Sequence, residues 1–335
     1  MKKGTVKKVF PLLLLCALVF SLCSCGLGGK NPLVIENTGV SKGIFAYYLD
    51  CVTANPKAYS IKENTKENVL SAAYELCKRY VAVQNFMKEN KIKTEQYLKS
   101  DANSKTDGLW SLFGAHYKSI GVSKEDVLNA ELSSAGKKQI VSHYFGKGGK
   151  NEVSQDELKQ SFVELYVGFK AIEAPLTKVN TRGETVPLTE KEKSALEEQF
   201  YSMAKKLQNG TDIDTLNAQY CRSINLVATQ ALEVNLAKKG DEMYDDDFFE
   251  KVSSVSHGTG RVIESGNSIY LIERCTIATN DEDAFRQYES EVLEYIKMPW
   301  VEKKIAALSS KYKVTQNKRL IEKIFKTVEK SRSHS

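Results

Sequence analysis

A long amphipathic pattern runs from Thr65 to Glu89. Apolar residues recur there at three- and four-residue spacing, at Val69, Ala72, Ala73, Leu76, Tyr80, Val83 and Met87. Such a repeat follows one face of a helix, so the segment predicts a long helix with one buried side. The same reasoning predicts helices after Ser41, Thr94, Leu109, Ser123 and Ser154, and over 281–310 and 319–330. The polar segment Asp101–Gly108 is predicted to be a loop.

The segment from Tyr166 to Thr276 has a different pattern. Residues 165–172 alternate in the manner of a strand with apolar residues on both faces. Thr189–Glu192 matches a capping box, and the apolar face of the following helix runs from Leu196 to Leu207. Two apolar runs on either side of Ser265-Gly-Asn267 predict a β-hairpin. The chain is therefore expected to be α+β, with its strands concentrated in the middle.

The first residues carry the pattern of an export signal. A positive start is followed by the apolar segment Val9–Leu22, which is shorter than the ~20 residues of an ordinary membrane span. Leu22-Cys-Ser-Cys25 resembles a bacterial lipobox, in which cleavage leaves Cys25 as a lipidated N-terminus. Cys23 is the poorer site because bulky Leu22 precedes it. The alternative is an ordinary signal peptide with incidental cysteines.

Charge argues against a nucleic-acid partner. The formal charge is +6, and removal of the four signal-peptide lysines leaves a mature protein near +2. This is not the strongly basic balance of a nucleic-acid-binding domain.

Cysteine and histidine spacing suggests no metal site and no cofactor. Five cysteines remain after the expected cleavage, and no two form a CxxC motif. Cys51–Cys77 and Cys221–Cys275 are conceivable disulfides, but buried free thiols are the favoured alternative. The four histidines are scattered along the chain. The acidic run Asp245–Asp247 is expected to lie at a helix N-terminus, where carboxylates are favourable, rather than to bind a cation.

The order of elements in the middle of the chain resembles the parvulin domain of SurA and PrsA-type foldases. The residues that carry this resemblance are Met203–Asp212, Leu216–Tyr220, Met243–Phe249 and the hairpin Arg261–Glu273. The opening segment 33–49 also resembles the start of the chaperone domain in these proteins. The resemblance implies a mostly helical SurA-like chaperone lobe built from both chain ends, with an inserted parvulin-like domain.

The resemblance also implies the domain boundaries. Residues 1–24 are the signal peptide, and 25–163 form the N-terminal part of the helical lobe. Residues 164–277 form the parvulin-like domain, and 278–335 form the C-terminal helices that complete the lobe.

Parvulins catalyse rotation about X-Pro bonds and carry two histidines and a nearby Cys or Asp. In this sequence the histidine positions fall on Ala171 and Tyr270, and the aspartate position falls on Ser223. Met243 and Phe248 (or Phe249) match positions of the proline pocket. Together with Phe169 and Tyr270 they are the candidate peptide-binding residues, although such spacing is also typical of a plain core. No catalytic residue is predicted.

The function implied by the resemblance is that of a lipid-anchored chaperone on the outer face of the bacterial cytoplasmic membrane. Its partners are unfolded or partly folded exported polypeptides and the membrane, with no nucleic acid. The missing histidines argue against efficient isomerase activity. An active prolyl isomerase of PrsA type and a non-catalytic adaptor for one envelope protein remain the alternatives.

Overall fold

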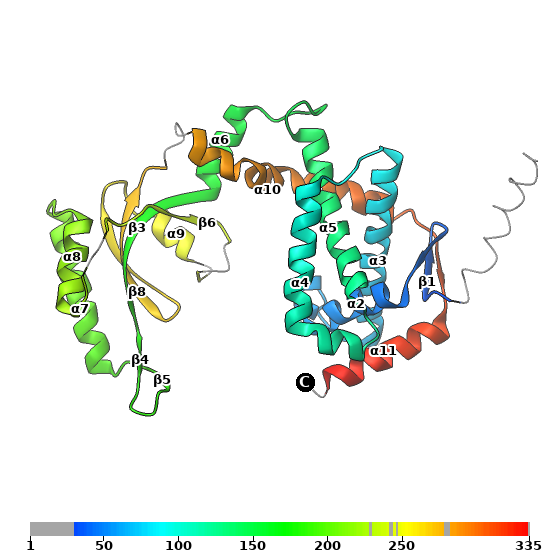
Figure 1. Cartoon of the computed structure of the whole chain (residues 1–335), viewed down its shortest axis with the longest axis horizontal. Helices are drawn as coiled ribbons and strands as arrows, with labels where there is room; N and C mark the ends of the chain where they lie inside the picture. The colour runs from blue at the N-terminus through cyan, green and yellow to red at the C-terminus, as the bar shows by residue number, and fades with distance from the viewer. Residues whose placement is uncertain (1–29, 228–229, 241–243, 246, 278–281, 334–335) are drawn as a thin grey trace, which may run out of the picture. The chain divides into compact units, whose positions relative to one another are not determined.

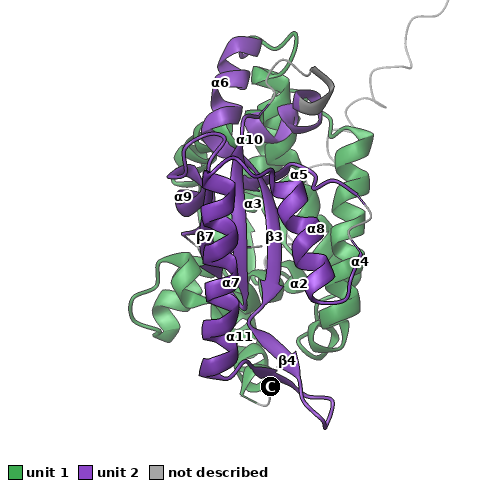
Figure 2. Cartoon of the chain, turned by 90° about the vertical axis from the view of Figure 1, so that its left-hand side faces the viewer, with its two compact units in different colours: residues 1–152, 293–335 green, residues 153–292 purple. Residues whose placement is uncertain are grey.

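A computed structural model describes residues 30–227, 230–240, 244–245, 247–277 and 282–333. The chain divides into two compact units (Figure 2). Unit 1 contains the described residues up to Glu152 and those from Leu293 onward, and unit 2 contains Val153–Val292. Helices dominate and the sheets are small, so the predicted α+β class is confirmed.

Unit 1 combines elements from both ends of the chain. Its helical and strand elements are β1 (Leu33–Ile35), β2 (Thr38–Val40), α2 (Lys42–Ala54), the 3₁₀ helix η2 (Pro56–Tyr59), α3 (Lys66–Glu89), α4 (Gln96–Ser119), α5 (Lys124–Phe145), the later part of α10 (Glu282–Ser309), β9 (Val314–Gln316) and α11 (Lys318–Arg332).

The strands join the two ends of the chain in one sheet. β1 pairs with β2 on one side and with β9 on the other, both antiparallel, and Leu33 lies opposite Gln316. Beneath this sheet, Phe45 and Leu49 of α2 and Ala73 and Cys77 of α3 are fully buried. The helical lobe therefore depends on residues from beyond the inserted unit.

Local signals place most helix starts of unit 1 where the sequence predicts them. The Ser41 and Thr65 hydroxyl groups accept hydrogen bonds from backbone N–H groups in the first turns of α2 and α3. Ser123 forms a complete capping box with Asp126 at the start of α5. These side chains satisfy N–H groups that have no partner within their helices.

The loop predicted for Asp101–Gly108 is wrong, because α4 runs through this segment. Ala102 and Thr106 lie four residues apart on the buried side of the helix and are each 2% exposed. The Thr106 hydroxyl donates to the Ala102 carbonyl oxygen at 2.7 Å, which satisfies its polar group inside the helix. Tertiary burial of small side chains overrides the weak helix propensity of this polar segment.

Unit 2 is built on a four-stranded antiparallel sheet in the order β6-β3-β8-β7. Its elements are α6 (Gln155–Leu165), β3 (Tyr166–Pro175), β4 (Thr177–Val179), β5 (Thr185–Pro187), α7 (Glu190–Gln208), α8 (Ile213–Ser223), β6 (Asn235–Lys238), α9 (Phe248–Ser253), β7 (Gly260–Ser265), β8 (Ser268–Cys275) and the beginning of α10. The predicted hairpin is β7–β8, and Gly266 in its turn has a φ of 58°, a conformation that favours glycine.

Helices cover both faces of this sheet (Figure 1). Phe200 of α7 and Leu216 of α8 pack with Leu271 on one face. Phe248 of α9 packs with Phe169 on the other. This division follows from the two-residue period of a strand, which sends successive side chains to opposite faces.

Unit 2 covers a longer part of the chain, Val153–Val292, than the 164–277 segment expected from the resemblance. Phe162 of α6 packs on Phe285 and Tyr288 of α10, with ring centroids 5.6 and 5.5 Å apart. This aromatic cluster attaches α6 and the beginning of α10 to the sheet unit rather than to the helical unit.

Candidate functional site

The sheet face beneath α9 brings together three of the four predicted peptide-binding residues. The Phe248 ring centroid lies 5.5 Å from that of Phe169 on β3 and 5.7 Å from that of Tyr270 on β8. Tyr244 stacks on Phe248, with centroids 4.1 Å apart and ring planes 8° from parallel. The fourth predicted residue, Met243, lies outside the described residues.

Burial shows which of these rings are accessible. Phe248 is 0% exposed and Phe169 is 2% exposed, whereas Tyr244 and Tyr270 are half-buried. The two phenylalanines therefore form the core between α9 and the sheet, the alternative that the sequence left open. Only the two tyrosines of this cluster are accessible from outside.

The two positions at which parvulins carry histidines lie on this same face of the sheet, but the side chains there are different. Ala171 has no polar side-chain atom. The Tyr270 hydroxyl donates to Glu173 Oε1 at 3.1 Å, and the Ser268 hydroxyl donates to the same oxygen at 2.7 Å. Burial raises the pKa of Tyr270, so its hydroxyl stays protonated at neutral pH.

Ser223, the position of the parvulin aspartate, belongs to the other side of the sheet. It ends α8, where its hydroxyl donates to the Tyr220 carbonyl oxygen at 2.7 Å and accepts from Gln199 at 3.1 Å. Tyr220 packs in the core under α7 and α8. The fold therefore does not assemble Ala171, Tyr270 and Ser223 into one site.

The acidic run before α9 has a structural role at its two described residues. The Asp245 carboxylate accepts from the Gly266 N–H at 2.6 Å, and Asp247 pairs with Lys251 at 2.9 Å. These contacts fix the loop to the β7–β8 turn and stabilise the first turn of α9. Among the described residues, no three His, Cys, Asp or Glu side chains gather in a way that suits a metal ion.

A second candidate site, which the sequence did not reveal, lies in unit 1. It is a cavity of about 410 Å³ among α2, η2, α3 and α5. Four tyrosines are the largest side chains that line it. The lining residues are Tyr47, Tyr48, Cys51, Tyr59, Leu76, Arg79, Tyr80, Ala130, Glu131, Ser133, Ser134, Lys137 and Glu302.

The charged groups of this cavity balance one another. Lys137 and Arg79 both approach Glu302, at 2.7 and 3.4 Å. Glu131 is the remaining carboxyl group, and its burial raises its pKa. Because two cationic and two acidic side chains line the cavity, its formal charge is close to zero at neutral pH.

The remaining polar groups of the cavity are held in their neutral forms. Burial raises the pKa values of the Tyr47 and Tyr48 hydroxyls and raises that of Cys51 to about 11. A thiol with such a pKa is a poor nucleophile at neutral pH. The cavity is therefore suited to hydrogen bonding and aromatic contact rather than to covalent catalysis.

The described cysteines, Cys51, Cys77, Cys221 and Cys275, are free thiols, the alternative favoured from the sequence. Cys25, the predicted lipidation site, lies outside the described residues. In the part of the chain that the structure describes, no helix has the length and apolar character needed to cross a membrane.

No protein-family model and no curated protein sequence matches this chain. Several solved structures do match this chain. The foldase protein PrsA from Streptococcus pneumoniae is 13% identical, with a TM-score of 0.38 over 78% of this chain and 87% of that chain. PrsA from Lactococcus lactis is 10% identical, with a TM-score of 0.34 over 90% of this chain and 99% of that chain.

A structure from Campylobacter jejuni, reported with PEB4 and Cj1289 as SurA-like chaperones, is 13% identical, with a TM-score of 0.25 over 86% of this chain and 99% of that chain. The solved structures that match are thus PrsA and SurA-like proteins, the group that the sequence resembles. Since these TM-scores are below 0.5, the function proposed next rests on the residues of this chain.

Proposed function

We propose that this protein is a membrane-anchored extracytoplasmic chaperone that binds unfolded or partly folded exported polypeptides without efficient prolyl isomerase activity. The observation that carries the proposal is the tyrosine-lined cavity of unit 1. Tyrosine rings offer large apolar contact area, and their hydroxyls hydrogen-bond with the backbone of an extended segment. Contact of this kind depends on area and tolerates many sequences.

Apolar side chains elsewhere on unit 1 add to the surface available to such segments. Leu112 of α4 is 76% exposed, and its neighbour Phe113 is 48% exposed. Large exposed apolar side chains are available to contact apolar segments.

The chemistry of unit 2 argues against catalysis. Rotation about a peptide bond has a barrier of ~20 kcal/mol. At the positions of the family's histidines, Ala171 supplies no hydrogen-bonding side chain, and the Tyr270 hydroxyl is already bonded to Glu173. A proline-containing tetrapeptide should therefore isomerise at the uncatalysed rate. A rate typical of active parvulins would support the alternative, a prolyl isomerase of PrsA type.

Anchoring through Cys25 is supported by Leu22-Cys-Ser-Cys25 at the end of the apolar segment. Replacement of Cys25 by Ser should release the protein from the membrane and block processing of the signal. A Cys25→Ser protein that stays membrane-bound with unchanged mass would contradict this part of the proposal.

Suppression of client aggregation tests the cavity directly. Ser134 lines the cavity and its residue is exposed, so Ser134→Trp should fill the entrance without removing a buried group. We expect the wild type to slow aggregation of a denatured client, and Ser134→Trp or Tyr59→Ser with Tyr80→Ser to do so several-fold less. Tyr201→Ser is the control, because Tyr201 is 56% exposed on unit 2.

Equal suppression by all variants would show that the cavity does not bind clients. If the wild type neither slows aggregation nor binds unfolded chains, the chaperone proposal is wrong. A pull-down that then recovers one folded partner in stoichiometric amount would favour the adaptor alternative.

A further inference from the structure

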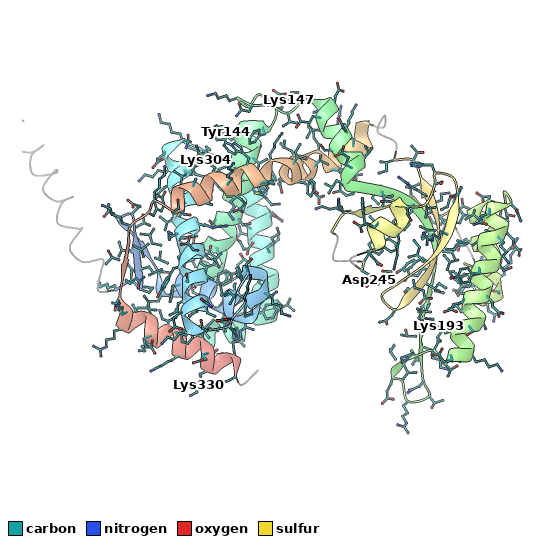
Figure 3. All side chains as sticks on the ribbon, turned by 180° about the vertical axis from the view of Figure 1, so that it is seen from behind. Tyr144, Lys147, Lys193, Asp245, Lys304 and Lys330 are labelled. Atoms are coloured by element: carbon teal, nitrogen blue, oxygen red, sulfur yellow. The ribbon has the colours of Figure 1, made fainter. Side chains whose placement is uncertain are left out.

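Helix α11 has one buried side and one strongly basic side. Ile321, Ile324 and Val328 face the core of unit 1. The exposed lysines and arginine of the other side, which we call the basic face, are Lys318, Arg319, Lys323, Lys326 and Lys330. Figure 3 shows Lys330 projecting outward from the helix.

Helix α11 carries fewer acidic than basic residues. Glu322 of the same helix contacts Lys66 at 2.5 Å and Lys326 at 3.6 Å. Glu329 is the other acidic residue of α11 and is exposed. The five basic residues of this face and the two glutamates of the helix together give a formal charge of +3 (5 − 2).

An open groove follows the last turns of the basic face. Its volume is about 630 Å³, and it is lined by Ser119, Lys323, Lys326, Thr327, Lys330 and Ser331. The three lysines lie at i, i+3 and i+7 on one side of the helix, and Ser119 comes from the end of α4. The lysine ammonium groups in this arrangement match the phosphate oxygens of lipid headgroups. The Ser119 and Thr327 hydroxyls donate within the protein, to the carbonyl oxygens of His116 and Lys323.

The chain enters unit 1 beside the beginning of this helix (Figure 1). The N–H of Asn317, the residue that caps α11, donates to the Pro32 carbonyl oxygen at 2.9 Å. Cys25 precedes Pro32 by seven residues. Since an extended chain spans at most ~3.6 Å per residue, lipidated Cys25 would hold the beginning of α11 within about 25 Å of the bilayer.

We propose that the basic face of α11 docks on an anionic bilayer, with headgroup phosphates against Lys323, Lys326 and Lys330. The docking goes beyond the chaperone function and acts together with the proposed anchor at Cys25. A lipid chain and a basic patch together hold a protein at a membrane more firmly than either alone. Each basic residue near an anionic surface strengthens partition about fivefold at moderate salt.

Vesicle binding by a protein of residues 26–335 tests this proposal without the lipid anchor and retains every described residue. We expect co-sedimentation with vesicles of phosphatidylglycerol and phosphatidylcholine, no binding to pure phosphatidylcholine, and weaker binding as salt increases. Replacing Lys323, Lys326 and Lys330 with Gln should lower partition about 100-fold.

The matched control replaces Lys191, Lys205 and Lys206 of α7 with Gln, which removes the same charge from exposed positions of unit 2. This control should change partition less than about threefold. Equal losses in both variants, binding to neutral vesicles, or no binding at all would overturn the proposal.

Two further measurements separate the outcomes. If the α11 variant loses affinity for polyglutamate but not for vesicles, the basic face binds acidic polypeptides and the membrane proposal is wrong. Suppression of client aggregation should be unchanged in the α11 variant, so that failure of membrane docking and failure of the chaperone proposal are distinguishable.

Discussion

Replacement of Arg332 by Gln should destabilise unit 1, because Arg332 neutralises a buried carboxylate. The side chain of Asp50 on α2 is 3% exposed. The Arg332 guanidinium donates to both of its oxygens, at 2.8 and 2.7 Å, and His116 of α4 lies 2.9 Å from one of them. These contacts hold the end of α11 on α2.

The size of the effect follows from the burial of the two partners. Removal of one partner of a buried ion pair costs roughly 3–5 kcal/mol, because the other charge remains out of water. The Arg332 side chain is 36% exposed, and His116 still contacts Asp50 in the variant. We therefore expect a loss at the lower end, about 3 kcal/mol in the free energy of unfolding.

Tryptophan fluorescence measures this loss of stability because it follows the unfolding of unit 1. The chain has two tryptophans, Trp110 and Trp300, and both belong to unit 1. At an m-value of about 2 kcal/mol per molar urea, a loss of 3 kcal/mol lowers the unfolding midpoint by about 1.5 M. Arg319→Gln removes the same charge from the exposed side of α11 and should cost less than about 0.5 kcal/mol.

A double-mutant cycle decides whether the loss comes from the ion pair. Asp50→Asn removes the buried charge that needs a partner, so the double variant Asp50→Asn/Arg332→Gln should be more stable than the two single losses predict. We expect a coupling of at least about 1 kcal/mol. If the single losses add within about 0.5 kcal/mol, Asp50 and Arg332 do not act as a pair and the reasoning is refuted.

Three other predictions concern single groups. Glu131→Gln should stabilise unit 1 at neutral pH, because burial raises the pKa of this carboxyl group in the folded state. The free energy of unfolding of the wild type should therefore fall as pH rises from the pKa of Glu131 in the unfolded chain to its pKa in the folded protein. Urea unfolding midpoints measured over this pH range should show the decrease in the wild type and lack it in the variant. Thr189→Ala removes the capping box with Glu192 and should cost about 1 kcal/mol, measurable as faster amide exchange in the first turn of α7. Cys51 and Cys77 should resist alkylation at about pH 8 until urea unfolds the protein. The reason is that burial raises the pKa of Cys51 to about 11 and that of Cys77 well above its usual range. Modification detected by mass spectrometry before unfolding would contradict this prediction.

The elements whose signals are local could be predicted from the amino-acid sequence. Ser41, Ser123, Ser154 and Thr189 all cap helices at the predicted positions, because a cap and the N–H group it satisfies lie within three residues. The β7–β8 hairpin is similarly specified by its turn. The α4 helix shows the limit of such signals, since only burial of Ala102 and Thr106 explains why a polar segment stays helical.

The candidate binding residues were only partly decided by sequence. Spacing and resemblance selected Phe169, Phe248 and Tyr270 from distant segments, and the fold does place them together. The same spacing suits core and binding residues equally, because both need apolar side chains on one face. Only their burial in the folded unit separated the two enclosed phenylalanines from the accessible tyrosine.

The tertiary structure alone decided the features that depend on distant segments. The cavity takes Tyr47, Tyr59 and Tyr80 from α2, η2 and α3, and its rim includes Glu302 from α10. Asp50 and Arg332, which form the buried ion pair, are 282 positions apart in the sequence. Neither arrangement has a local pattern, since each residue suits its own helix whether or not its partner exists. Packing of the two chain ends into one unit is the physical step that brings these groups together.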